Sequence, residues 1–194
     1  MRLIIIVLLS LIMISCTEKD KDKYDDLYEV IDEMLRFNNY DADIVILELK
    51  KVHKGNDMVA PMNFITYNKD FIISLYKDKL LDSTDIDFMY NQIDTLKDYT
   101  LDSTKIFKRT LSESVLISLF KKYGSYGTYD YLMDKYNARC FMRISMPIIS
   151  KDRNKMILDV ETYCGPTTGG GLTYLLERKN GKWRIIFCRG NWVS

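Results

Sequence analysis

The chain has 194 residues, of which 47% are hydrophobic, so it is long enough and apolar enough to bury the core of one domain. It carries 28 lysines and arginines against 27 aspartates and glutamates. This near-neutral balance excludes the basic surface that nucleic-acid binding requires, and we expect no nucleic-acid partner.

The N-terminus has the features of a bacterial export signal. Arg2 supplies one positive charge, and the apolar run that follows, residues 3–14, is interrupted only by Ser10. A membrane-spanning helix needs about 20 apolar residues, whereas the core of a signal peptide has about 7–15. The run therefore predicts a signal peptide over residues 1–15. A plain secretory signal with an incidental cysteine and a buried helix are the alternatives.

The end of this signal resembles the lipobox of bacterial lipoproteins, in which a bulky residue, a tolerated position and a small residue precede the acylated cysteine. The matching residues are Met13, Ile14, Ser15 and Cys16. The resemblance implies cleavage before Cys16 and a lipid anchor on that cysteine, so that the membrane is a partner of the protein. Thr17 follows where an aspartate would retain such a protein at the inner membrane. We therefore expect a lipid-anchored protein of the bacterial cell envelope, with the outer membrane favoured.

Residues 17–23 are all polar and nearly all charged, so with Cys16 they predict a lipidated cysteine and a charged tether over residues 16–23. A frayed first helical turn is the alternative for this segment. When extended, residues 17–23 reach about 25 Å. The rest of the chain, residues 24–194, is expected to form a single α+β domain.

Helical periodicity predominates in the first half of this domain. An apolar stripe predicts a helix over residues 24–37. A second helix is expected to begin with Ser83 as its N-cap, and a third to run from Ser112 to a C-cap at Gly124. Residues 129–136 fit one further short helix.

Two segments of the first half are ambiguous. Residues 43–52 contain the β-branched run of a buried strand, yet they could also continue as a helix, and we favour a helix that ends near Gly55. Residues 62–76 fit either a strand or a short helix.

The second half changes to strand-like patterns separated by turn signals. The four runs are residues 139–147, 155–164, 172–179 and 182–193. Asn180-Gly181 predicts a two-residue type I′ turn, which would pair Leu176 with Ile185, Leu175 with Ile186 and Thr173 with Cys188. The expected fold class is α+β, with N-terminal helices packed on a C-terminal four-stranded antiparallel meander.

Three cysteines remain in addition to Cys16. The turn at residues 150–153 brings Cys140 opposite the stretch that ends at Cys164, and both are expected on the apolar face of one hairpin. In an oxidising compartment they could form a disulfide. The alternative is three buried free thiols, counting Cys188. A zinc site would need a fourth ligand, and the single histidine, His53, has no ligand spacing, so we expect neither a metal nor another cofactor.

The segment after Cys164 is the most unusual in the chain because it is rich in glycine and threonine. Its residues are Gly165, Thr167, Thr168, Gly169, Gly170 and Gly171, with Pro166 among them. A phosphate-binding loop would open a helix and contain a lysine, whereas this segment joins two strands and has none. We interpret it as a wide turn or bulge, with the rim of a binding site as the alternative.

No pattern predicts a catalytic residue. Asp159, Glu161 and Tyr163 are expected on one strand face with Arg143 across from Glu161, and this arrangement is more typical of a solvated charge ladder than of acid–base catalysis. His53 is expected at the surface. Trp183 and Trp192 are expected in the sheet core or at its edge, where an exposed ring could stack on a sugar.

Several short motifs of the second half resemble an uncharacterised family of small secreted and lipid-anchored bacterial proteins. They comprise residues 83–89 with Gln92, residues 144–149, Tyr163-Cys164-Gly165 with Gly169-Gly170-Gly171, Gly181-Lys182-Trp183, and Trp192-Val193-Ser194. The resemblance implies an exported protein with a β-rich C-terminus. It implies no activity.

The expected function is that of a membrane-anchored envelope lipoprotein that binds a small ligand or another envelope protein. An envelope hydrolase acting on glycans or peptides is one alternative. A cleft that contains a charged pair with shifted pKa values would favour it. An immunity or inhibitor-type protein is another. An exposed apolar patch without such a pair would favour binding.

Overall fold

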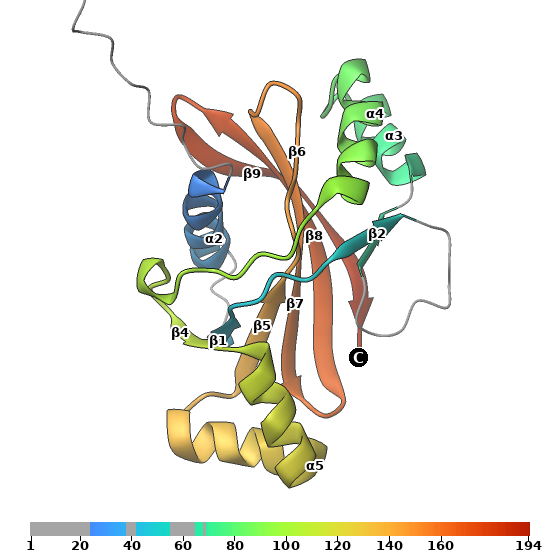
Figure 1. Ribbon diagram of the computed structural model, residues 1–194. Coiled ribbons are helices and arrows are strands. Elements are labelled where there is room, and N and C mark those ends of the chain that lie inside the picture. Colours follow the sequence, from blue (N-terminus) through green and yellow to red (C-terminus); the bar gives the residue numbers. More distant parts are fainter. Residues whose placement is uncertain (1–23, 38–41, 55–64, 68) are drawn as a thin grey trace, which may run out of the picture.

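A mixed sheet with helices on both faces forms the domain in the computed structural model, which describes residues 24–37, 42–54, 65–67 and 69–194 (Figure 1). Within these residues seven strands join in the order β4-β1-β5-β7-β8-β9, with β6 also paired to β7. Their bounds are β1 Ala42–Ile46, β4 Arg109–Leu111, β5 Cys140–Ile144, β6 Ile148–Ile149, β7 Lys155–Gly165, β8 Thr168–Lys179 and β9 Lys182–Val193. A separate parallel pair consists of β2 (Val52–Lys54) and β3 (Ile65–Tyr67).

The α+β class and the C-terminal antiparallel meander are confirmed, but the expected count of four strands is wrong. The sheet continues beyond β5 into β1 and β4, and β1 pairs in parallel with both of these neighbours. Residues 43–52 therefore do not form the helix that the sequence favoured. Ile44, Val45 and Ile46 are fully buried. A strand that is buried on both faces is apolar at every position. Its sequence therefore lacks the polar–apolar alternation that identifies a half-buried strand.

The hairpin of β8 and β9 has the predicted turn and only part of the predicted register. Asn180 and Gly181 have φ values of 52° and 75°, as a type I′ turn requires, and Leu176 pairs with Ile185. Beyond this pair, a bulge at Ile186 shifts the register, so Leu175 pairs with Phe187 and Thr173 with Arg189. Their predicted pairings with Ile186 and Cys188 are wrong because a bulge adds one residue to a single strand, which turn type does not predict.

The helices begin and end close to the predicted residues. They are α2 (Asp25–Phe37), α3 (Lys69–Lys77), α4 (Ser83–Gln92) and α5 (Glu113–Tyr136), with short 3₁₀ turns η1 (Ile93–Thr95) and η2 (Ser103–Lys105). The N-cap of α4 is Asp82 rather than Ser83, and Ser112 caps α5 as expected. Gly124 has a φ of 69° inside α5, so the two predicted helices meet there at a kink.

Residues 62–76 contain both of the structures that the sequence allowed, since β3 is followed directly by α3. No helix in the described part of the chain is long and apolar enough to cross a membrane. The signal peptide, Cys16 and the tether lie outside the described residues.

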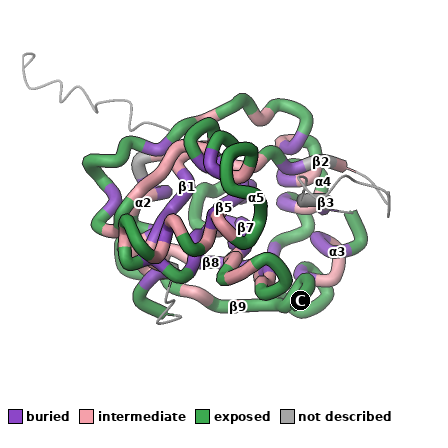
Figure 2. The backbone as a smooth tube through the Cα atoms, turned by 90° about the horizontal axis from the view of Figure 1, so that it is seen from below, coloured by how far each residue is buried: buried purple, intermediate pink, exposed green. Residues whose placement is uncertain are grey.

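The two faces of the sheet are covered differently. Val45 belongs to the large core cluster that includes Leu27, Val30 and Ile31 of α2, whereas the neighbouring Ile44 and Ile46 pack with α5. Because side chains alternate along a strand, α2 and α5 lie on opposite faces. Figure 2 shows the resulting buried band along the sheet strands β1, β5, β7 and β8.

The face that carries α5 also holds α3 at its other end, where the Arg189 guanidinium lies 4.2 Å from the centre of the Phe71 ring. Figure 1 shows α5 at one end of the sheet and α3 with α4 at the other. Between these two apolar ends the same face carries the charged side chains of β7.

Candidate functional site

The glycine segment lies mostly within a strand rather than in a wide turn. β7 ends at Gly165 and β8 begins at Thr168, so only Pro166 and Thr167 lie between the strands. A register shift between Tyr163 and Gly165 leaves Cys164 as a bulge. Gly170 and Gly171 pair with both β7 and β9, while Gly169 pairs with β7 and exchanges backbone hydrogen bonds with Ser194, just after β9. Part of the wide-turn interpretation is therefore wrong, since only the bulge is present.

Two of these glycines provide space for the indole of Trp192. A Cβ atom on Gly171 would lie 2.4 Å from Trp192 Nε1, and one on Gly169 would lie 3.0 Å from the far edge of the ring. Neither separation is possible for ordinary van der Waals contact. The ring therefore packs flat on the backbone of β8, where any larger residue would push it outward.

On the opposite face of the same strands lies an open groove of about 650 Å³. It is lined by Thr162, Cys164, Thr168, Gly169, Gly170, Gly171, Leu172, Gly190, Asn191, Trp192, Val193 and Ser194. Cross-strand pairing places Thr162, Gly170 and Val193 in one row and Leu172 with Gly190 in the next. Thus four of the residues expected at a binding rim do line a groove, while Gly165 and Thr167 do not.

The chemistry of this groove is apolar and uncharged. None of the twelve lining residues named above has an ionisable side chain other than Cys164, whose sulfur is in a disulfide. Glycines leave the floor as bare backbone, with Leu172 and Val193 beside it. The Thr162 hydroxyl is buried without a hydrogen-bond partner among the described atoms. A buried hydroxyl left unpaired costs about 1–3 kcal/mol.

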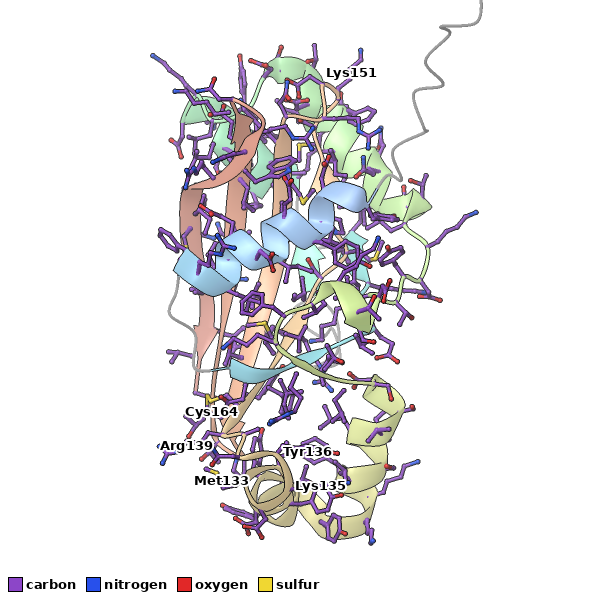
Figure 3. The ribbon with its side chains drawn as sticks, turned by 90° about the vertical axis from the view of Figure 1, so that its left-hand side faces the viewer. Met133, Lys135, Tyr136, Arg139, Lys151 and Cys164 are labelled. Carbon is purple, nitrogen blue, oxygen red and sulfur yellow. A yellow bond between two sulfur atoms is a disulfide. The ribbon has the colours of Figure 1, made fainter. Side chains whose placement is uncertain are left out.

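A disulfide between Cys140 and Cys164 borders the groove and joins β5 to β7. The two cysteines are 24 residues apart in the sequence. Figure 3 shows Cys164 close to Arg139, the residue that precedes β5. Cys188 is free and exposed, and it pairs with Tyr174 in the sheet. The alternative of three buried thiols is therefore wrong for this structure.

On the α5 face, the expected solvated charge ladder is instead buried. Asp159 is 1% exposed and Glu161 is 8% exposed. Arg143 does lie opposite Glu161 in the register, but its guanidinium forms an ion pair with Glu113 at the start of α5. Glu161 instead pairs with Lys50, and it also accepts a hydrogen bond of 2.9 Å from the Tyr163 hydroxyl. The prediction failed because the covering elements come from distant parts of the chain.

Asp159 is held by side chains of two other strands, β8 and β9, and by Ser145, which follows β5. Its Oδ1 accepts hydrogen bonds from Thr173 Oγ1 and, at 2.8 Å, from Asn191 Nδ2. The Ser145 hydroxyl accepts its backbone N–H at 2.9 Å. Burial raises the pKa of the Asp159 carboxyl above its ordinary value of 3.8. The second oxygen, Oδ2, is buried without a partner among the described atoms.

Tyr67 of β3 lies beside this carboxyl. It is fully enclosed, and burial together with the nearby Asp159 charge raises its pKa well above 10.0. A buried carboxyl and a buried phenol, in both of which burial disfavours the charged form, thus lie side by side. This pair joins β3 to the centre of the sheet.

An aromatic row crosses the same face next to the charges. Ring centres are 5.9 Å apart between Tyr129 and Phe141, 5.2 Å between Phe141 and Tyr163, and 5.6 Å between Tyr163 and Trp192. The Arg143 guanidinium lies 5.5 Å from the centres of the Phe141 and Tyr163 rings. Burial, with the neighbouring Glu161 charge, raises the pKa of Tyr163. The row connects α5 to the last strand of the sheet.

These contacts indicate that the carboxylates of β7 hold the fold together. Glu161 fixes the segment of Lys50, Asp159 fixes β3 and β9, and Arg143 fixes α5. Sequence reasoning did not identify Lys50, Tyr67, Glu113 or Asn191. No spacing could have found them, because each lies between 30 and 111 residues along the chain from the side chain that it contacts.

The two tryptophans and the single histidine lie apart from the charged cluster of β7. Trp183 is buried beneath Arg178, at 4.8 Å, and Trp192 is 36% exposed at the sheet edge. His53 lies in β2, and its side chain is outside the described part. Among the described residues, no group of three or more His, Cys, Asp or Glu could hold a metal ion.

Comparison with known proteins adds no family. No family model matches the chain, and no curated protein matches it. Among solved structures, a protein of unknown function with a cystatin-like fold from Nostoc punctiforme is similar, with 14% identity and a TM-score of 0.23. The match covers 34% of this chain and 53% of that one. At this level it supports no argument about fold or function.

The packing of the Trp192 indole on Gly171 can be tested with Gly171→Ala. The added methyl group should push the partly exposed indole into water, which should shift its fluorescence to the red and lower the free energy of unfolding by about 1 kcal/mol. Gly190→Ala is the matched control, since a Cβ there meets nothing within 4 Å. An unchanged spectrum for Gly171→Ala, with Trp183 as the buried reference, would contradict the packing described.

The buried carboxyl can be tested through the pH dependence of stability with Asp159→Asn. The pKa of Asp159 is higher in the folded state than in the unfolded state. The stability that Asp159 contributes is therefore complete below about pH 4 and is lost as the pH rises through the pKa of the folded state. Asparagine does not titrate, so the variant should gain stability relative to wild type between pH 4 and pH 7. Each unit of pKa shift corresponds to about 1.4 kcal/mol in unfolding measurements.

Asp102→Asn serves as the control, because the stability that Asp102 contributes should change with pH in the opposite direction. Hydrogen bonds from Thr104 lower the pKa of Asp102, so its contribution should be lost as the pH falls rather than as it rises. Parallel stability curves for wild type and Asp159→Asn would show that Asp159 is not buried as described.

Proposed function

We propose that this protein is a lipid-anchored lipoprotein of the bacterial envelope whose domain binds a small, uncharged and largely apolar ligand. The observation that carries the binding proposal is the groove of about 650 Å³ on β7, β8 and β9, which is floored by glycine backbone and lined by no side chain that titrates. Ligand pockets are mostly apolar with a few polar groups that fix orientation. The exposed residue Thr168 supplies such a group at the groove.

The lipid anchor is supported by the sequence alone. The apolar run of residues 3–14 has the length of a signal-peptide core, and Cys16 follows it in a lipobox-like setting. The disulfide between Cys140 and Cys164 fits an oxidising compartment outside the cytoplasm. The outer membrane stays favoured because Thr17, not aspartate, follows Cys16.

An envelope hydrolase is less well supported. Its acid–base pair would have to be Asp159 and Glu161, which are the carboxylates with different environments on one strand. Both are more than nine-tenths buried, and each already has partners within the protein. A substrate would have to displace Lys50 or Asn191 to reach them.

A protein-interaction role, as in an immunity or inhibitor-type protein, is the second candidate. One observation favours it: α5 exposes Tyr126 at 72% and Tyr123 at 39%, at the end of the sheet where the helix kinks. Exposed tyrosines are common anchors of protein interfaces. This surface is separate from the groove.

The groove can be tested with the neutral apolar probe N-phenyl-1-naphthylamine and a Cys16→Ala chain, which carries no lipid. Gly190→Leu should weaken probe binding at least tenfold, because its side chain would enter open groove space where a Cβ meets nothing within 4 Å. Fluorescence titration measures the affinity, and unfolding should stay within about 1 kcal/mol of the parent.

Ser125→Leu adds the same side chain at an exposed position of α5, and it controls for binding to any added leucine. Equal probe affinity in the parent, Gly190→Leu and Ser125→Leu chains would argue against the groove as the binding site.

The anchor can be tested by intact mass and membrane fractionation of wild type and Cys16→Ala. Wild type should carry lipid mass and sediment with membranes, whereas the variant should become soluble, since an unlipidated N-terminus has no acyl chains to bury. A wild-type chain that is soluble, unlipidated and cut at another residue would disprove the anchor.

A further inference from the structure

The first described residues of the domain mark where any tether must attach. Tyr24 lies at the start of α2, and its ring centre is 4.5 Å from that of Tyr99. One turn later, the Tyr28 hydroxyl accepts the backbone N–H of Asp102 at 2.9 Å. Lys105 Nζ lies 4.8 Å from the centre of the Tyr28 ring. The chain that follows Cys16 therefore enters the domain beside the segment around η2.

The length of that chain limits how far this side of the domain can move from the anchor. Eight peptide units separate Cys16 from Tyr24, so the two residues are at most about 28 Å apart. The domain surface nearest to Tyr24 is therefore the surface held closest to a bilayer that contains the lipid on Cys16.

This surface presents one large apolar side chain between basic ones. Phe107 is 60% exposed, and Lys105 and Lys108 lie on either side of it in the sequence. The neighbouring Ile106 is 7% exposed and packs into the core, which turns Phe107 outward. Phe107 is two positions after Lys105, so the Cα atoms of the two residues lie within about 7 Å of each other.

The segment is also held in one shape before any partner binds. The Asp102 carboxylate accepts bonds from the Thr104 N–H at 2.9 Å and from the Thr104 hydroxyl at 2.7 Å. Arg109, at the other end, donates to the Tyr136 carbonyl of α5. Residues 102–109 contain one acidic residue, Asp102, and three basic residues. A preorganised, basic and aromatic surface loses little entropy on binding.

We propose that residues 105–108 form a bilayer-contact surface, in which Phe107 enters the headgroup region and Lys105 and Lys108 bind anionic lipid headgroups. Aromatic side chains flanked by lysines are typical of segments that lie at a membrane surface. The long lysine stems can extend along the apolar region while their ammonium groups stay with the phosphates. The proposal rests on the lipid anchor at Cys16.

The test uses the mature, lipidated chain in vesicles of phosphatidylethanolamine and phosphatidylglycerol, with and without brominated acyl chains that quench tryptophan at the bilayer. Phe107→Trp should be quenched at least twice as strongly as Phe37→Trp, with wild type correcting for Trp183 and Trp192. Phe37 is the matched control because it is also 60% exposed, at the other end of α2, about 18 Å from its first turn.

Replacing both Lys105 and Lys108 by glutamine in the Phe107→Trp chain should halve the quenching in these vesicles and leave it unchanged in purely zwitterionic ones. Equal quenching of Phe107→Trp and Phe37→Trp in a chain of lipidated mass would overturn the contact surface alone, and would point instead to a protein partner for Phe107. A chain that floats with no vesicles and carries no lipid would overturn the anchor, and with it this inference.

Discussion

The fold depends on keeping two carboxylates buried in the middle of the sheet. β7 lies between β5 and β8, and its polar face is covered by α5 at one end and by α3 at the other. A buried charge without a partner costs several kcal/mol, so each carboxylate must be matched. Lys50 matches Glu161, while Thr173 and Asn191 hold Asp159. The positions of Lys50, of β3 through Tyr67, and of β9 through Asn191 are tied to that requirement.

One bulge of β9 serves the same requirement. A regular strand would place its side chains in strict alternation, but the register shift between Gly171 and Leu172 leaves Asn191 as an extra residue. Its amide can then reach back across β8, donating to Asp159 at 2.8 Å and accepting from Thr173 at 3.0 Å. Bulges commonly re-aim one side chain in this way. The bulge also sets Trp192 over Gly171.

The glycines at residues 169–171 connect this polar face with the groove on the other side. On one face they leave room for the Trp192 indole, which ends the aromatic row from α5. On the opposite face they leave bare backbone as the floor of the groove. Glycine is thus required for both the packing of the indole and the open groove. A side chain on Gly169 or Gly171 would clash with the ring, and one on Gly170 would fill the groove.

Much of the fold could be predicted from local patterns, and much of the site could not. The α2 stripe, the cap at Ser112 and the turn at Asn180-Gly181 are local, and each agrees with the structure. β1 was misassigned because a strand buried on both faces has no alternation to detect. The partners of Asp159 and Glu161 were missed because they arrive through long-range pairing, in which Lys50 and Glu161 are separated by 111 residues. The groove was foreseen only as a glycine-rich segment, since its shape depends on a register set by bulges.

The positions of the two ends of the domain relate the proposed membrane anchor to the proposed binding groove. Figure 1 places the start of α2 on the upper left and the C-terminus on the lower right, and the C-terminal residues 190–194 line the groove. With an anchor at Cys16 and Phe107 at the bilayer, the groove lies at the part of the domain farther from the membrane. A ligand would then reach it from the surrounding solution rather than from the bilayer that holds the protein. The disulfide between Cys140 and Cys164 joins β5 to β7 at the border of this groove.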